Sequence, residues 1–204
     1  MKLTSTMFLS VDGVYQGPGG PTEDTSGGFE RGGWLVPHFD EATGAFMNDV
    51  FGRVDAFLLG RRTYDIFAAY WPTAADPGDP TANKLNALPK YVASTTLRDP
   101  TWEHTTVVGG DVVDAVRELK GRPGNELQVH GSGMLVRSLF ENDLLDELNL
   151  LVFPVIVGAG RRLFPESALS TGLVLESSRT TPSGVLIATY RTAGRPEFGE
   201  IPGA

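Results

Sequence analysis

Cysteine is absent from this chain of 204 residues, and histidine is rare, with three copies. Without thiols the protein cannot form disulfides, zinc–thiolate sites or a cysteine nucleophile, so a reducing compartment suits it. The histidines, His38, His104 and His130, lie far apart in the sequence, and no carboxylate cluster has the spacing of metal ligands. We therefore expect no metal site.

Positive charge and long apolar segments are also scarce. Lys and Arg total 17 against 25 Asp and Glu, which gives a net charge of -8 and a pI of about 4.9. An acidic chain repels phosphate backbones and anionic lipids, so we expect no binding to nucleic acid or to membranes. No apolar run approaches the roughly 18 residues of a membrane helix, and the N-terminus lacks the pattern of a signal peptide. These features predict a cytoplasmic protein.

The sequence alternates short apolar runs with amphipathic segments, which is typical of an α/β fold with a largely parallel sheet. The predicted strands span residues 2–10, 54–59, 90–95, 105–108, 126–130 and 146–153. The predicted helices begin near residues 39, 63, 112 and 132. Two final runs, residues 172–180 and 185–192, flank a short turn and predict an antiparallel hairpin. We expect one domain over residues 1–193 and a loose tail over residues 194–204.

Two segments are expected to be loops. Residues 13–33 contain eight glycines and two prolines, and a loop of this length inside a compact domain is usually functional or mobile. Residues 73–89 are rich in proline and aspartate, which predicts a surface loop within the domain.

Two strand–helix junctions share a composition that suits an anion. Gly60 follows a strand and is followed at once by Arg61, Arg62 and Thr63 at the start of a helix. The free N–H groups at a helix start favour negative charge, and the arginines and the hydroxyl add to this preference. Residues 131–134, Gly-Ser-Gly-Met, follow a second strand in the same way, and glycine allows a ligand to approach the backbone closely.

A ligand with two phosphate-bearing parts would use both junctions, because ligands of open α/β sheets collect beyond the carboxyl ends of the strands. Ser94 and Thr95 follow a third strand and offer hydroxyls for an adenosine 2′-phosphate. Each signal also has a simpler interpretation. A Gly-x-Gly after a strand is more often a tight turn, and Arg61 or Arg62 could pair with Asp65 on the surface.

Four parts of the chain resemble the dihydrofolate-reductase-like superfamily. Residues 55–64 (DAFLLGRRTY) resemble its second strand and following helix, where an apolar strand leads into Gly-Arg-x-Thr and an aromatic residue. Residues 127–133 (LQVHGSG) resemble the glycine pair before its cofactor-facing helix. The serine between these glycines, together with residues 148–160 and 10–14, is similar to the riboflavin-biosynthesis reductase branch, the RibD C-terminal domain.

The resemblance implies a three-layer αβα sandwich around a mostly parallel mixed sheet, with NADPH as the cofactor. Cofactor binding would then involve two sets of residues, Gly60, Arg61, Arg62, Thr63, Ser94 and Thr95, and Gly131, Ser132, Gly133 and Met134. The loop over residues 11–37 would correspond to the mobile loop that covers nicotinamide in dihydrofolate reductases. The chemistry would be transfer of a hydride from the cofactor.

The substrate side rests on a looser pattern. Trp34, Pro37 and Asp40 echo the tryptophan–proline–carboxylate pattern of dihydrofolate reductases, with one residue more between them. The catalytic candidates are therefore Asp40 and Asp12, and the substrate-binding candidates are Trp34, Tyr70 and Trp71. Asp40 could instead cap its helix, Asp12 could turn the chain, and aromatic residues that end a helix are often core.

Several functions remain open at this stage. The resemblance implies reduction of a phosphoribosylamino-pyrimidine or of another small heterocycle, as in riboflavin biosynthesis. The alternatives are a dihydrofolate reductase, a flavin or carbonyl reductase, and a nucleotide-binding module without catalysis. Related reductases tend to be dimers, so we expect a homodimer, in which residues 148–157 form either an edge for pairing or a buried central strand.

Overall fold

The protein is described by a computed structural model that covers residues 1–74, 78–166 and 170–201. Its centre is an eight-stranded sheet with the order β4-β3-β2-β5-β1-β6-β8-β7. The strands are β1 (Lys2–Ser10), β2 (Val54–Gly60), β3 (Lys90–Ala93), β4 (Thr105–Val108), β5 (Glu126–His130), β6 (Glu147–Phe153), β7 (Leu173–Thr180) and β8 (Leu186–Thr192).

The sheet is parallel from β4 to β6 and becomes antiparallel at β8 and β7. This arrangement confirms the predicted α/β fold with a C-terminal hairpin. The hairpin turn is closed by Gly184, whose φ of 85° suits glycine and whose N–H donates to the Thr181 carbonyl. The central strands β5, β1 and β6 are neighbours and run parallel, so their carboxyl ends meet at one edge of the sheet.

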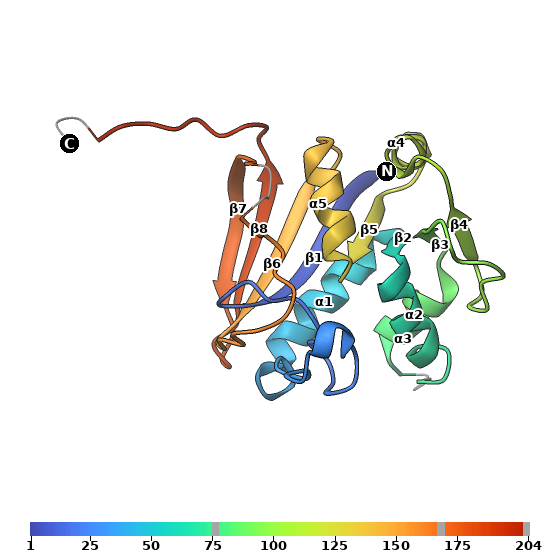
Figure 1. Ribbon diagram of the computed structural model, residues 1–204, viewed down its shortest axis with the longest axis horizontal. Coiled ribbons are helices and arrows are strands. Elements are labelled where there is room, and N and C mark those ends of the chain that lie inside the picture. Colours follow the sequence, from blue (N-terminus) through green and yellow to red (C-terminus); the bar gives the residue numbers. More distant parts are fainter. Residues whose placement is uncertain (75–77, 167–169, 202–204) are drawn as a thin grey trace.

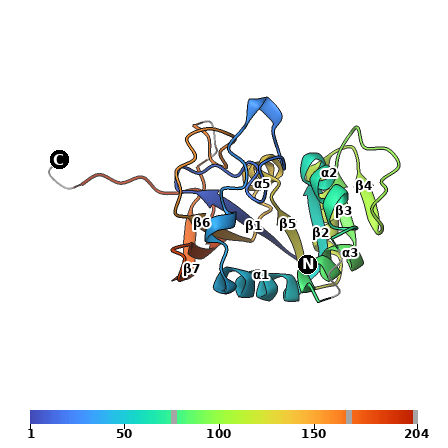
Figure 2. The same cartoon turned by 90° about the horizontal axis from the view of Figure 1, so that it is seen from below.

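Helices cover both faces of the sheet, as Figures 1 and 2 show for α1 and α5. The helices are α1 (Glu41–Arg53), α2 (Arg61–Tyr70), α3 (Pro80–Ala87), α4 (Val112–Gly121) and α5 (Gly133–Glu141). One buried apolar cluster includes side chains of α1, α2 and α3, and the other includes side chains of α4 and α5. The three layers therefore enclose two cores, one on each side of the strands.

One expectation about the elements was wrong. The predicted loop at residues 73–89 contains α3, which Asp79 caps by accepting from the Thr81 N–H, with Pro80 at the first helical position. Residues 75–77 of that loop lie outside the described residues. For residues 148–157 the structure supports the second of the two alternatives, because β6 lies between β1 and β8 and is a central strand.

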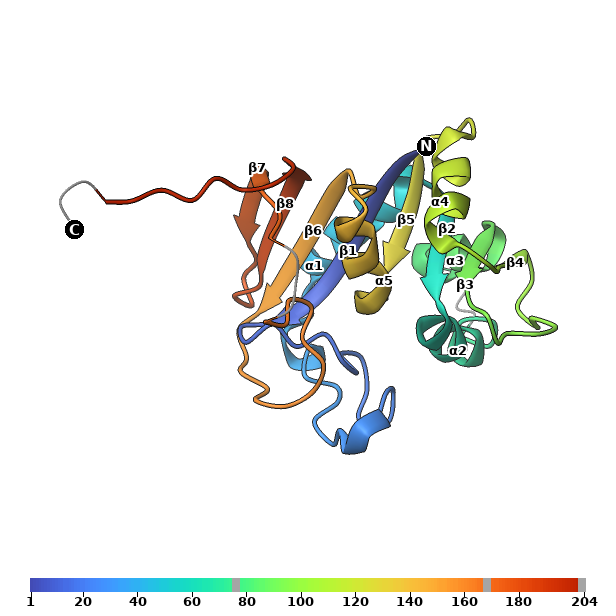
Figure 3. The same ribbon diagram turned by 45° about the horizontal axis from the view of Figure 1, so that its top comes forward.

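The long loop between β1 and α1 lies against the loop that follows β6, below the sheet in Figure 3. Val14 forms a β-bridge with Arg162, and the Tyr15 N–H donates to the Arg161 carbonyl over 3.0 Å. Two short 3-10 turns, Ser26–Gly28 and Val36–His38, lie within the first loop. We call residues 11–37 the lid loop.

The edge strands of the sheet are β4 and β7, and all eight residues of β7 are solvent-exposed. The expected homodimer stays a prediction. Beyond Ala193 the described chain runs away from the domain (Figure 1), and residues 202–204 of the predicted tail lie outside the described residues. Among the residues described, no helix is long and apolar enough to cross a membrane.

Candidate active site

The first junction predicted to bind an anion forms where β2 ends at Gly60 and α2 begins at Arg61. Gly60 occupies the N-cap position, and no side chain caps the helix there. The first N–H groups of α2 therefore point outward without the capping partner that most helices have. Arg61 forms an ion pair with Asp65 at 2.8 Å and also donates to Thr96. The surface pairing of Arg61 considered from the sequence is confirmed.

The second junction lies beside the first. Gly131 has a φ of +65°, which favours glycine, and Ser132 stands at the N-cap of α5 without capping it. The Ser132 hydroxyl instead joins the two junctions, because it accepts from the Gly60 N–H over 2.8 Å and donates to the Thr63 hydroxyl over 2.9 Å. This arrangement holds two uncapped helix N-termini next to each other.

Both junctions open into one cavity of about 770 Å³. Eight of the predicted cofactor residues line it, namely Gly60, Arg61, Arg62, Thr63, Gly131, Ser132, Gly133 and Met134. The lid loop closes one side with the ring of Tyr15, which lies so near Gly133 that a Cβ added there would stand 2.5 Å from it. Glycine at this position therefore allows the lid loop to lie on the start of α5.

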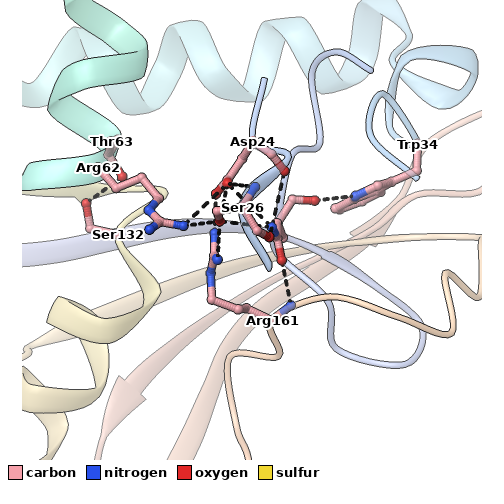
Figure 4. Close-up of polar contacts among 8 residues, drawn as sticks. Asp24, Ser26, Trp34, Arg62, Thr63, Ser132 and Arg161 are labelled. Carbon is pink, nitrogen blue, oxygen red and sulfur yellow. Dashed lines mark hydrogen bonds and ion pairs between the residues drawn. The ribbon is translucent and has the colours of Figure 1, made fainter. Parts of the chain in front are cut away.

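One end of the cavity is charged, and Figure 4 shows how its groups converge. Asp24 of the lid loop forms ion pairs with Arg62 of α2 and Arg161 of the loop after β6, and Ser26 accepts hydrogen bonds from both arginines. Burial alone would raise the pKa of Asp24, but hydrogen bonds from Ser26 and the two guanidinium groups lower it further than burial raises it. We call Asp24, Ser26, Arg62 and Arg161 the charged end.

The charged end could be predicted from the sequence only in part. Arg62 belonged to the predicted cofactor residues, whereas Arg161 did not. Asp24 was not singled out, because 137 residues separate it from Arg161 and only the fold brings them together. Gln16 fixes this contact, since its side chain donates to the Ser26 carbonyl and accepts from the Arg161 N–H.

Another part of the cavity lining is apolar, and we call it the aromatic end. It is lined by Phe8, Leu35, Phe67, Trp71 and His130. His130, the last residue of β5, is 9% exposed, and its Nδ1 has no hydrogen-bond partner among residues 1–74, 78–166 and 170–201. Burial lowers its pKa to about 4, so the imidazole is neutral at pH 7. The sequence predicted His130 as a strand residue but gave no sign that it faces a cavity.

The three predicted aromatic substrate residues lie in different environments in the structure. Trp71 lines the aromatic end. Trp34 is buried, donates from Nε1 to the Gln16 carbonyl over 2.9 Å and meets the ring of Phe153 edge-on, so it belongs to the core. Tyr70 is 59% exposed and is not among the residues that line the cavity. Trp34 is thus a core residue, contrary to its predicted substrate role. The core alternative, raised for Tyr70 and Trp71, does not describe the exposed Tyr70, and Trp71 lies where a ligand could contact it.

The two predicted catalytic carboxylates lie outside the lining of this cavity. Asp40 caps α1, because its Oδ1 accepts from the Thr43 N–H over 2.8 Å and its Oδ2 accepts from the Ser183 N–H over 3.0 Å. Burial by itself would raise its pKa, but these hydrogen bonds lower the pKa well below the ordinary value of an aspartate. The capping alternative therefore describes its geometry, and a group so acidic is a poor proton donor at neutral pH.

Asp12 holds the loop after β6 against the end of β1. Its two oxygens accept from the N–H groups of Val157 and Gly158, each over 2.9 Å, and Ser10 donates to it over 2.7 Å. Burial opposes these hydrogen bonds, and the balance places the pKa of Asp12 well below its ordinary range. The turn-forming alternative describes Asp12, which lies in the turn after β1 and is not among the residues that line the cavity.

Ser94 and Thr95 also lie outside the cavity lining. The Ser94 hydroxyl accepts from the N–H groups of Thr96 and Leu97, which forms the turn after β3. This turn adjoins the first junction through the contact of Arg61 with Thr96. The role of Ser94 and Thr95 at the adenosine end of the cofactor stays a prediction. No group of three acidic or histidine side chains that could hold a metal occurs in the described part of the chain.

Comparison with known proteins identifies the family. The RibD C-terminal domain family matches residues 1–187, and the chain therefore belongs to it. Among curated proteins, the uncharacterized protein YyaP of Bacillus subtilis is 25% identical over 197 residues, which cover 95% of this chain and 96% of YyaP. The uncharacterized protein YwjB of the same organism is 27% identical over 146 residues and covers 72% of this chain and 78% of YwjB.

Solved structures share the fold. A putative riboflavin biosynthesis protein from Shewanella sp. PV-4 matches with a TM-score of 0.71 at 24% identity, covering 95% of this chain and 99% of that one. A pyrimidine reductase-like protein from Corynebacterium diphtheriae matches with a TM-score of 0.61 at 14% identity, covering 94% and 92%. The resemblance predicted from the sequence is thereby confirmed for family and fold.

Proposed function

We propose that the protein is an NADPH-dependent reductase that transfers a hydride to a small heterocyclic acceptor bound at the aromatic end. Membership of the RibD C-terminal domain family supports a reductase role, and the structural neighbours are named for riboflavin biosynthesis and pyrimidine reduction. The observation that carries the proposal is the pair of uncapped helix N-termini, bridged by Ser132, at the mouth of one cavity.

The residues at the two junctions fit a dinucleotide. The N–H groups at the starts of α2 and α5 would hold the pyrophosphate, and the dipoles of both helices favour its charge. Arg61 and Arg62 would add cationic partners for the phosphates. Arg62 is engaged by Asp24 in the structure, so phosphate binding would require an exchange of partners at the charged end. The cofactor, when bound, supplies the hydride.

The chain's own contribution would be to hold the acceptor flat against the aromatic end and to exclude water. Leu35 and Trp71 line this end, and the lid loop forms a wall beside the start of α5 through Tyr15. Exclusion of water prevents loss of the hydride to solvent and strengthens polar contacts within the site. Among the described residues, the carboxylates that line the cavity are those of Glu23, Asp24 and Asp65. Burial raises the pKa of Glu23, so the proton that completes reduction of the acceptor would come from Glu23 or from solvent.

A titration of tryptophan fluorescence with NADPH and with NADH tests the cofactor. Trp71 lines the cavity and provides the signal. Arg61→Ala and Arg62→Ala should each weaken NADPH binding about 10- to 100-fold, because a charge-assisted hydrogen bond contributes about 1.5–3 kcal/mol. NADH, which lacks the 2′-phosphate, should bind more weakly to the parent protein and respond less to the substitutions.

The matched control is Arg117→Ala. Arg117 also forms an ion pair within its helix, with Asp114, but it lies on the exposed face of α4. Its removal should leave both affinities within twofold. Absence of NADPH binding to the parent protein would refute the proposal, whereas binding without turnover of any heterocyclic acceptor would favour the alternative of a nucleotide-binding module.

A further inference from the structure

His130 occupies a position in which a hydrogen-bonding ring is surrounded by aromatic carbon. Its ring centroid lies 5.3 Å from that of Phe8, 5.8 Å from that of Phe67 and 6.0 Å from that of Phe51. Val129, the preceding residue, packs into the core beneath α4 and α5. Because side chains alternate along a strand, His130 points to the opposite face, where Phe8 and Phe67 line the cavity with it.

The imidazole is the polar group at this end that lacks a partner. A neutral imidazole carries one donor and one acceptor, and Nδ1 of His130 is buried without a hydrogen bond among the described residues, which exclude 75–77, 167–169 and 202–204. Buried polar groups in folded proteins nearly always have partners, and an exception calls for an explanation. His130 lines the cavity although Nδ1 itself is closed off from it, so a ligand supplies the missing partner when the imidazole turns its Nδ1 toward the cavity.

The charges around the cavity limit the kind of ligand. Arg62 and Arg161 lie at the charged end, where both form ion pairs with Asp24. Glu23, Arg61 and Asp65 also line the cavity. The aromatic end offers rings, aliphatic carbon and one neutral imidazole. A charged group placed there would lose its hydration without gaining a counter-ion, which is unfavourable. A flat ring with an uncharged amide or carbonyl edge would stack on the aromatic side chains and satisfy His130.

We propose that His130 recognises the acceptor, and that the acceptor is an uncharged, flat heteroaromatic compound with a hydrogen-bonding edge. This inference rests on the proposed function, because the compound is an acceptor only when the reduced cofactor transfers a hydride to it. Recognition itself requires only the contacts at the aromatic end. His130 is thus a binding residue that determines specificity.

The test uses quinazolin-4-one as a probe, because it is flat, uncharged and carries an amide edge. Its carboxylated derivative, quinazolin-4-one-6-carboxylate, is the matched charged probe. The protein contains three histidines, so the imidazole nitrogen signals can be assigned by NMR with few variants. We expect quinazolin-4-one to shift the ring nitrogens of His130 and to leave those of His38 and His104 in place, and the carboxylate to bind at least tenfold more weakly.

Two substitutions separate recognition from packing. His130→Phe keeps a flat ring among aromatic neighbours but removes the nitrogens, and it should weaken quinazolin-4-one binding at least tenfold. His130→Gln restores an uncharged hydrogen-bonding group and should recover part of that loss. Thermal unfolding of each variant verifies that it is folded, and NADPH titration of the same samples measures the cofactor site separately.

Three results would overturn the inference. They are equal affinity of the parent protein and His130→Phe for the probe, unchanged His130 signals at saturating probe, and no binding of the probe at millimolar concentration. Failure of NADPH to bind, with His130 still responding to quinazolin-4-one, would refute the proposed function and leave the recognition site intact. The two proposals therefore fail in distinguishable ways.

Discussion

The two ends of the cavity satisfy their polar groups in opposite ways. At the charged end, Arg62 and Arg161 already bind Asp24 and Ser26, so every cation there has a partner within the protein. At the aromatic end, the Nδ1 of His130 is buried without one among the described residues. A ligand must therefore displace existing contacts at the charged end, whereas at the aromatic end it completes a contact that the fold leaves open.

Acid should change the protonation of the aromatic end before that of the charged end. This prediction has the largest expected effect, a loss of folding stability. Unfolded histidine binds a proton below about pH 6.5, while burial lowers the pKa of folded His130 to about 4. The unfolded state therefore binds more protons within this window, and folding stability falls as the pH drops from 6.5 toward 4. The full loss is about 3 kcal/mol, because each pKa unit corresponds to about 1.4 kcal/mol.

Urea unfolding at several pH values between 7 and 4 measures this loss, and His130→Phe is the matched variant because it cannot bind the proton. The variant should lack that share of the pH dependence. Asp24 has a lowered pKa, so its contribution is retained above its ordinary pKa and is lost only as the pH falls further. Parallel pH curves for the two proteins would mean that His130 is not buried in its neutral form.

The contact between the two junctions gives the next largest effect. Ser132→Ala removes the hydroxyl that accepts from the Gly60 N–H and donates to Thr63. Loss of a buried partner costs about 1–3 kcal/mol, so the free energy of unfolding should fall by that amount and NADPH affinity should fall with it. Ser178→Ala, on the exposed strand β7, is the control and should change stability by less than about 0.5 kcal/mol. Equal effects of the two substitutions would show that the bridge contributes nothing.

The site could be predicted from sequence where its geometry is local. A strand, a glycine and a helix start follow one another within residues 54–63, so this strand–helix junction and its arginines were predicted correctly as neighbours in space, whereas anion binding there stays a prediction. The same holds for the capping of α1 by Asp40, which depends on Thr43, three residues away. The second partner of Asp40, Ser183, lies 143 residues away and could not be found from the sequence.

The rest depends on contacts between distant parts of the chain. Asp24 meets Arg161 only because the lid loop lies against the loop after β6. His130 was placed correctly in a strand, but its significance depends on which face of the sheet it points to and on the absence of a partner there. The spacing between Trp34 and Asp40 is one residue longer than in dihydrofolate reductases, so the sequence left open whether Asp40 is catalytic or a helix cap. The hydrogen bond from the Ser183 N–H to Asp40 resolves its geometry, and only the fold reveals that contact.

Removal of the Asp24 charge from the charged end should have a moderate effect on the affinity for the cofactor. Asp24→Asn removes the carboxylate that now holds Arg62 and Arg161, so a phosphate would no longer compete with it. We expect the Kd for NADPH to fall about 3- to 10-fold, which corresponds to about 1 kcal/mol, and to become more sensitive to salt. Asp114→Asn, which breaks the exposed pair with Arg117, is the control. Weaker NADPH binding by Asp24→Asn would instead indicate that the lid loop must stay docked for the cofactor to bind.

The smallest effect is expected from Tyr70, which the sequence grouped with Trp71 as a substrate residue. The two are neighbours at the end of α2, and their rings meet edge-on at 5.0 Å, but Tyr70 is 59% exposed and only Trp71 lines the cavity. Tyr70→Ala should therefore leave the affinity for quinazolin-4-one within twofold, whereas Trp71→Ala removes a stacking surface and should weaken it severalfold. NMR titration of both variants with the probe measures the difference. A larger loss from Tyr70→Ala than from Trp71→Ala would place the acceptor outside the aromatic end, on the exposed side of α2.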